Sequence, residues 1–314
     1  MNSRLKRLLY GCGNVLAAVG LLFVVWKVWD WREQLLSADV FSPFMVFCLV
    51  LLGICSTLFS MLQACGWRQI LRHFGGQISG RMALRLYGIS QIAKYIPGNI
   101  AQFVSRQAIG RAEAFSNKAL GLSTLFELAF LAVTSASCAI LLLPYLNRLE
   151  LVNKLSFLTF VQAPAPLAVL LFSLIIACLY IFLRRFFGAL MASALKFYYF
   201  YVAFMGFIFL AIILLLSGPD KSIDEIVLIF VVGVMAYLVG FITPGAPSGI
   251  GVREAVIVFI MPGLATMQTI LLTAILWRVI SIFGDILFYI LARTIFKPPV
   301  PKQEAKHAPM ADNL

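Results

Sequence analysis

Seven ionisable side chains interrupt long apolar stretches of this sequence, and they are the residues with the clearest potential for chemistry. A charge at the centre of a membrane helix costs at least about 2.5–3.5 kcal/mol. Such a residue is retained when it binds a ligand, moves a proton or pairs with another buried charge. The seven are Lys94, Arg106, Glu127, Arg253, Glu254, Arg278 and Asp285.

Two of these residues, Arg106 and Arg253, lie beside glycine-rich backbone whose N–H groups are expected to be free. A guanidinium beside free amides suits a phosphate, which it binds through two parallel hydrogen bonds. For Arg106 the alternative is a side chain that reaches lipid head groups at the membrane interface. For Arg253 the alternative is a structural ion pair with Glu254 or with a neighbouring helix. The full set of candidate substrate contacts is Lys94, Asn99, Arg106, Arg253, Glu254 and Arg278.

Two acidic residues are candidates for a proton or ion site. Glu127 is the only acid in its apolar stretch, and its alternative is a capped or protonated structural carboxyl. Asp285 lies two helical turns after Arg278, which is too far for a direct pair without help from side-chain reach or water. Both members of this couple are expected to face the bundle interior, where they bind substrate or an ion or hold helices together. Lys94 precedes the first break by three residues, and its alternative is a place at the interface.

Two apolar regions, 82–110 and 226–262, contain residues that break helices, and we call them the first and second break regions. Proline removes a backbone donor and clashes with the preceding turn, while glycine permits non-helical dihedrals. A break at membrane depth survives only where protein or water covers the freed backbone groups. A short helix, a break and a second short helix are typical of a re-entrant hairpin. The break residues are Pro97, Gly98, Pro244, Gly245, Pro247, Gly249 and Gly251.

The two break regions also resemble each other. In each, an arginine stands nine residues after the proline of a Pro-Gly pair, and a long apolar stretch follows. The charge distribution places their entrances on opposite sides of the membrane. Two matching units of opposite orientation form an inverted-topology repeat, with the substrate site where the broken helices meet. The alternative is a chance likeness, because Pro-Gly pairs are common in membrane proteins and the matched positions are few.

The elements that must position these residues are membrane helices. The chain is 62% hydrophobic and 12% charged, whereas soluble domains are about 45–50% apolar and about 25% charged. In lipid, each crossing segment must satisfy its own backbone hydrogen bonds, and this requirement favours helices. We therefore predict an all-α integral membrane protein with two re-entrant hairpins, eight helical segments in all, over residues 1–296, and a disordered tail over 297–314. The six expected full crossings are 8–29, 43–65, 119–143, 165–183, 197–216 and 265–293.

Basic residues are distributed unequally between the two sides of this arrangement. The net charge is +12, and most of the 25 Lys and Arg residues flank the expected crossings on the side of the N-terminus. The opposite loops, about 27–42, 144–163 and 217–225, contain few. The positive-inside rule therefore predicts a multi-pass membrane protein with cytoplasmic N- and C-termini. Attraction to anionic head groups explains the basic charge, so we expect membrane lipids as partners and no nucleic acid.

Several enzyme classes do not fit the sequence. The six cysteines lie in or beside apolar segments without C-x-x-C spacing, and His73 and His307 are far apart, so no metal site is expected. The chain has no G-x-x-x-x-G-K-[ST] phosphate loop and no complete dinucleotide fingerprint. No Ser/His/Asp or Cys/His set lies within the apolar segments. We therefore expect no enzyme activity and no cofactor.

The sequences around the two breaks resemble a known family. K-Y-I-P-G-N-I-A-Q-F-V-S-R (Lys94 to Arg106) and T-P-G-A-P-S-G-I-G-V-R-E-A (Thr243 to Ala255) are similar to signatures of the lysylphosphatidylglycerol synthase transmembrane family. The resemblance covers about residues 10–295. It implies a protein of the bacterial cytoplasmic (inner) membrane that moves lipids between leaflets, like the flippase half of the multiple peptide resistance factor.

Two departures from the family bear on function. Bifunctional members carry a cytoplasmic domain that transfers lysine to phosphatidylglycerol, which is not expected here because only a short tail follows Phe296. Ser248 also replaces a glycine of the usual P-G-G-x-G pattern, so the resemblance leaves the substrate open. The expected function is a lipid flippase or flippase-like transporter for an anionic phospholipid or a polyprenyl-linked lipid. The alternative is a non-transporting scaffold partner of an envelope-biosynthesis enzyme that modifies lipids or glycans.

Overall fold

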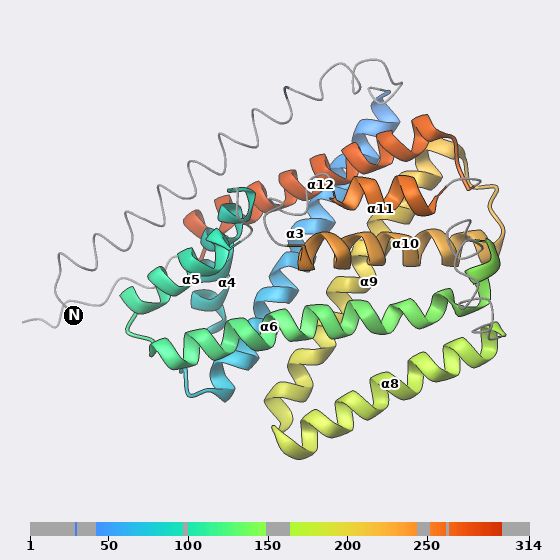
Figure 1. The fold of residues 1–314 in the computed structure, drawn as a ribbon. Coiled ribbons are helices and arrows are strands. Elements are labelled where there is room, and N and C mark those ends of the chain that lie inside the picture. Colours follow the sequence, from blue (N-terminus) through green and yellow to red (C-terminus); the bar gives the residue numbers. More distant parts are fainter. Residues whose placement is uncertain are drawn as a thin grey trace, which may run out of the picture.

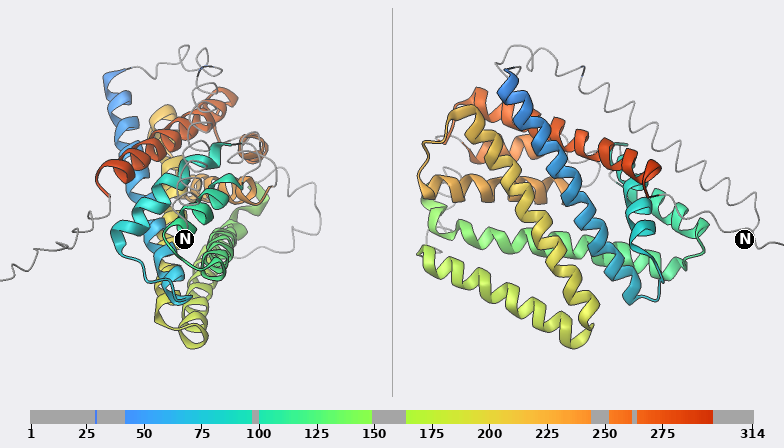
Figure 2. Two further views of the ribbon diagram at one scale, coloured as in Figure 1. Left: turned by 90° about the vertical axis from the view of Figure 1, so that its left-hand side faces the viewer. Right: turned by 180° about the vertical axis from the view of Figure 1, so that it is seen from behind.

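A computed structural model gives the fold of the chain (Figures 1 and 2). It describes Trp29 and residues 42–96, 100–148, 164–243, 252–261 and 264–296. Within these residues every regular element is a helix. The chain is therefore all-helical over its described part, as the composition predicted.

Among the described residues, six helices are long and apolar enough to cross a membrane by length and composition. They support a multi-pass membrane protein, and five of them overlap expected crossings over most of their length. The expected crossing 8–29 lies outside the described residues apart from Trp29. The six are α3 (Pro43–His73), α6 (Asn117–Cys138) with its 3₁₀ continuation η3 (Ala139–Arg148), α8 (Ala165–Phe186), α9 (Ala189–Ser217), α10 (Ile223–Ile242) and α12 (Met267–Thr294).

The two break regions are built from limbs of unequal length. The first has the two short helices expected, with the 3₁₀ turn η2 at the end of the first: α4 (Gly80–Gln91), η2 (Ile92–Tyr95) and α5 (Ala101–Ala112). In the second, α10 is long enough to cross the membrane, because a Ser222/Glu225 capping box starts the helix before the apolar run. The short α11 (Val252–Ile260) follows. The helix that precedes the second break is thus longer than the short helix that the sequence predicted.

Close contact between α3 and α12 depends on two glycines. A Cβ added to Gly284 would lie 3.1 Å from the Gly53 carbonyl oxygen and 2.8 Å from Cβ of Ser56. The Thr57 hydroxyl donates to the Gly284 carbonyl at 3.0 Å. Small residues let membrane helices approach closely and exchange such hydrogen bonds. The α3–α12 contact therefore tolerates little added volume.

The buried and exposed apolar surfaces follow the arrangement of the helices. The main core lies where α9 packs on its neighbours, with Phe209, Ile212 and Val232 fully buried. By contrast, α8 buries only Ala168 and Leu183 and leaves most of its apolar side chains exposed. An apolar helix with so little protein cover is suited to contact with lipid.

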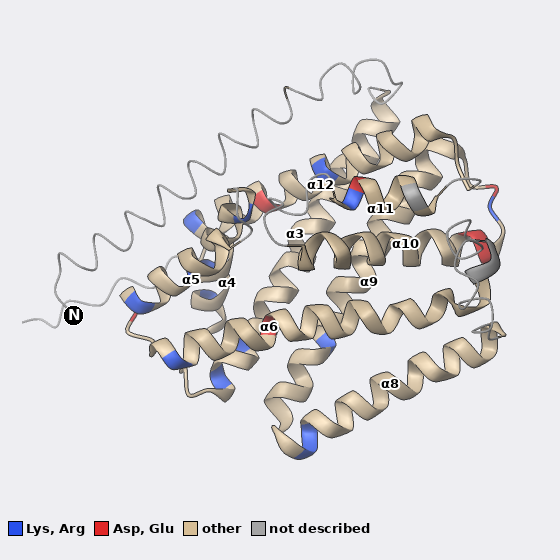
Figure 3. Ribbon diagram, in the orientation of Figure 1, with Lys and Arg blue, Asp and Glu red and all other residues tan. Residues whose placement is uncertain are grey.

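Basic residues gather at one end of the bundle. Figure 3 shows them where α3 leads into α4, where α5 leads into α6, where α8 leads into α9 and where α12 ends. Arginines occupy the last turns of α3, α5, α8 and α12, where the helix dipole favours a positive charge. Acidic residues mark the opposite end at the start of α10. The two ends of the bundle thus differ in charge.

Candidate functional site

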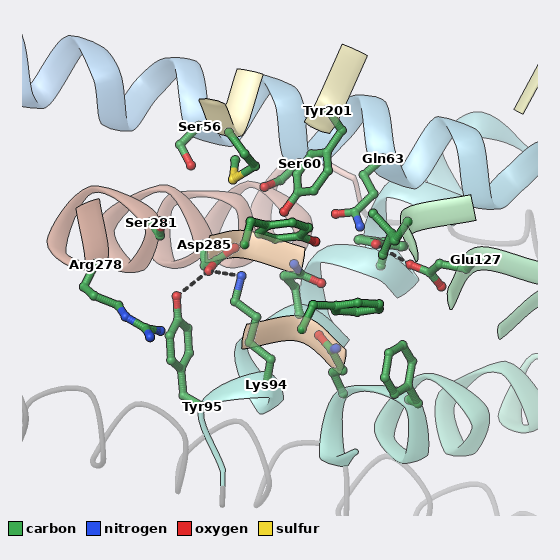
Figure 4. A pocket seen from close by; sticks show the side chains of 18 of the residues that line it. Ser56, Ser60, Gln63, Lys94, Tyr95, Glu127, Tyr201, Arg278, Ser281 and Asp285 are labelled. Carbon is green, nitrogen blue, oxygen red and sulfur yellow. Dashed lines mark hydrogen bonds and ion pairs between the residues drawn. The ribbon is translucent and has the colours of Figure 1, made fainter. Parts of the chain in front are cut away.

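A polar cavity lies at the centre of the bundle (Figure 4). Its walls come from α3, α4, η2, α5, α6, α9, α10, α11 and α12. The cavity offers about 50 Å³ to the centres of water molecules, which is room for a few waters. Serine, glutamine, tyrosine and charged side chains form much of its lining. A polar interior in a bundle of apolar helices marks the position of the site.

Both break regions border this cavity. Lys94 and Tyr95 line it just before the first break, and Gln102 lines it just after. Phe241 and Arg253 line it on either side of the second break. Residues far apart in the sequence thus share one cavity. The break residues themselves and Asn99 lie outside the described residues: Pro97, Gly98, Pro244, Gly245, Pro247, Gly249 and Gly251.

The first buried ion pair joins Arg106 of α5 to Glu127 of α6. Arg106 Nη1 lies 2.5 Å from Glu127 Oε2, and each residue is only 1% exposed. Tyr87 donates to the other carboxylate oxygen, and Arg106 Nε donates to Ser90 Oγ at 3.1 Å. Glu127 lines the cavity, but Arg106 lies behind its wall. In this structure Arg106 contacts neither lipid head groups nor the cavity, and it neutralises Glu127.

The second ion pair joins the first break region to α12. Lys94 Nζ lies 2.5 Å from Asp285 Oδ2, and the Tyr95 hydroxyl donates to the same oxygen. Figure 4 shows the three side chains converging inside the cavity. Asp285 is 2% exposed. Lys94 therefore projects into the bundle, and its charge is balanced there.

The third ion pair joins the second break region to α12. Arg278 Nε donates to Glu254 Oε1 at 2.8 Å, and Arg278 Nη2 lies 3.4 Å from Oε2. The sequence left a structural pair between Arg253 and Glu254 open, but Glu254 pairs with the following long helix instead. Arg278 and Asp285 do not pair with each other, consistent with their spacing on α12.

Of the four basic residues at the site, Arg253 is the one without an acidic partner in the described part of the chain. It is 9% exposed, and its Nε has no hydrogen-bond acceptor there. Its guanidinium lies over the rings of Tyr237, at 4.8 Å, and Trp277, at 5.5 Å. A Cβ on Gly240 would lie 2.4 Å from Arg253 Cγ, so glycine provides the space for this side chain. The site thus holds four basic and three acidic residues, and Arg253 carries the surplus charge.

A neutral polar wall completes the cavity, and sequence reasoning missed it. Ser56, Ser60 and Gln63 line the cavity from one face of α3, and Gln91 adds a second amide from α4. Both glutamines are at least nine-tenths buried, and their Oε1 atoms have no hydrogen-bond partner among the described residues. The available signal was a set of polar residues at helical spacing within an otherwise apolar segment.

Comparison of the chain with protein-family models, curated proteins and solved structures finds no match. The fold and the site define a polytopic α-helical membrane protein with a buried, polar and positively biased cavity. Its function therefore has to be argued from the cavity.

Proposed function

We propose that the chain is a lipid flippase or flippase-like transporter that moves an anionic lipid between the leaflets of the cytoplasmic membrane. The observation that carries this proposal is the surplus cation Arg253 in a cavity bordered by both break regions. An intramembrane charge without a partner is costly, and a ligand of opposite charge is a common reason for keeping it.

The setting of Arg253 suits a phosphate. Stacking on Tyr237 and Trp277 holds the guanidinium plane without using its N–H donors. Arg253 Nε has no acceptor among the described residues, and a guanidinium can bind two phosphate oxygens in parallel. Because the other three cations at the site are already paired, a phosphate would bring the charge of the site closer to balance. Arg253 is therefore the proposed phosphate contact, and Arg106 supports the site through Glu127.

The proposed path uses re-entrant hairpins related as an inverted repeat. The contacts around the two arginines support this arrangement: Arg106 of α5 stacks on Tyr87 of α4, and Arg253 of α11 stacks on Tyr237 of α10. In each region the short second helix also forms an ion pair with the long helix that follows. In such transporters one unit rocks against the other around a central site. The basic end of the bundle faces the cytoplasm in this proposal.

The cavity has room for a few waters and not for a whole lipid. We propose that the head group passes through the bundle interior while the acyl chains stay in the surrounding bilayer. Passage then requires the helices that border the cavity to separate, first on one side and then on the other.

Purified protein in liposomes provides the test. A fluorescent phosphatidylglycerol is placed in both leaflets, and an impermeant reductant then bleaches the outer one. With the protein present, inner-leaflet probe should become accessible at a rate that rises with protein content, while protein-free liposomes should keep it protected. Unchanged protection with correctly inserted protein would contradict the proposal. Co-purification with a lipid- or glycan-modifying enzyme would then favour the scaffold alternative.

A further inference from the structure

We infer that the cavity selects a head group that joins a phosphate to a neutral, hydroxyl-bearing group such as glycerol or a sugar, and rejects one that carries an ammonium. This inference rests on the proposed function. It adds the substrate class, which we argue from the other side chains that line the cavity together with Arg253.

Two buried amides leave hydrogen-bonding capacity in the cavity unused. Gln63 is 3% exposed and Gln91 is 4% exposed, and the Oε1 atom of each is without a partner among the described residues. A buried polar group without a partner costs about 1–3 kcal/mol. A hydroxyl both donates and accepts, so it suits an amide in either of its two orientations. Hydroxyls on the ligand would therefore satisfy both glutamines.

The surrounding wall has the same neutral character. Figure 4 shows Ser56, Ser60 and Gln63 following one another along α3, with the Tyr201 hydroxyl near them. Lys94 and Asp285, which form an ion pair, lie apart from Gln63 in the same view. The cavity thus offers a neutral, hydrogen-bonding surface in addition to its charged groups. A head group with an anionic part and a polyol part matches both.

The charges of the cavity argue against an ammonium. Glu127 and Asp285 are the acids that line it, and each already has a cationic partner and a tyrosine hydroxyl. An ammonium would have to enter beside Arg253 and the other cations of the lining, where both described carboxylates are already paired. Like charges at close range repel strongly where water is scarce. A zwitterionic head group therefore gains less at this site than an anionic polyol.

Rates for three labelled lipids in the same proteoliposomes test the inference. They are phosphatidylglycerol, phosphatidic acid, which lacks the added hydroxyls, and phosphatidylethanolamine, which carries an ammonium. Wild-type protein should move phosphatidylglycerol fastest and phosphatidylethanolamine slowest. Gln63→Met and Gln91→Met preserve side-chain length, and each should lower the phosphatidylglycerol rate about three- to ten-fold. Both should lower the phosphatidic acid rate by a smaller factor, because that head group lacks the hydroxyls that the glutamines would bind.

Gln69→Met is the matched control. Gln69 lies on the same helix and also has an unpartnered Oε1, but it does not line the cavity. Its substitution should leave all three rates unchanged. Thermal unfolding in detergent confirms that each variant is folded.

Different outcomes would overturn different claims. Equal wild-type rates for phosphatidylglycerol and phosphatidylethanolamine would overturn the inferred selectivity and leave transport intact. Absence of movement for all three lipids would overturn the proposed function itself. Uptake of soluble glycerol 3-phosphate without lipid movement would show that the same chemistry serves a free ligand, and it would overturn the lipid as substrate.

Discussion

At the residue scale, the seven described charged residues of the site form three ion pairs and leave one cation, Arg253, without an acidic partner. The pairs join different helices. In each pair the acid neutralises a basic side chain whose charge would otherwise be costly in an apolar environment. Arg253 differs because its neighbours are aromatic rings and a glycine. Substitution of a paired arginine should therefore destabilise the protein more than substitution of Arg253.

Arg106→Met should destabilise the protein far more than Arg253→Met. The first substitution leaves Glu127 buried and charged without its partner, which costs about 3–5 kcal/mol. The second removes a cation that has no acid to leave behind. Thermal unfolding in detergent measures both, and adding Glu127→Gln to Arg106→Met should recover part of the loss. Equal destabilisation by the two single substitutions would contradict the assignment of Arg253 as the surplus charge.

At the element scale, α12 holds the site together. Asp285 ties it to the first break region, and Arg278 ties it to the second. On its other side, Gly284 packs against α3, which carries the serines and the glutamine of the neutral wall. A change in the α3–α12 distance would therefore move the charged residues of α12 relative to the neutral wall on α3.

Gly284→Ala should lower the thermal stability, at a cost of about 1–3 kcal/mol for overpacking. The added Cβ would lie 2.8 Å from Ser56 Oγ and 3.1 Å from a backbone oxygen of α3, and backbone has little freedom to yield. Gly121→Ala is the control, because a Cβ at that helical glycine meets no atom within 4 Å. It should be neutral or slightly stabilising, since alanine favours helix. The account of the helix contact fails if the two substitutions have the same effect.

At the scale of the whole molecule, composition and periodicity were sufficient for the class of fold. Long apolar runs predicted the helices because lipid leaves few alternatives. The length of α10 was not predicted because the apolar region begins at about residue 226. The capping box at Ser222 starts the helix before that point. Where such a helix begins and ends depends on local capping residues as well as on the apolar run.

The candidate site was predictable in its members but not in its pairings. Charged residues in apolar sequence stand out individually, and all seven candidates lie in or around one buried cluster. Their partners come from other helices, and Tyr95 and Asp285 are separated by 190 positions in the chain. The neutral wall was not predicted because a serine or glutamine in an apolar segment carries a smaller free-energy cost than a charge does. Such residues are therefore a weaker signal of function.

The most direct test of the account compares Arg253→Lys and Arg253→Gln with the wild type for phosphatidylglycerol movement in liposomes. Arg253→Gln removes the cation and should slow transport roughly ten-fold or more. Arg253→Lys keeps the charge but loses the paired donors, so it should retain part of the rate. Arg293→Gln, at an exposed arginine near the end of α12, is the matched control and should leave the rate unchanged. Wild-type transport by a stable, correctly inserted Arg253→Gln protein would contradict the phosphate contact at the centre of the account.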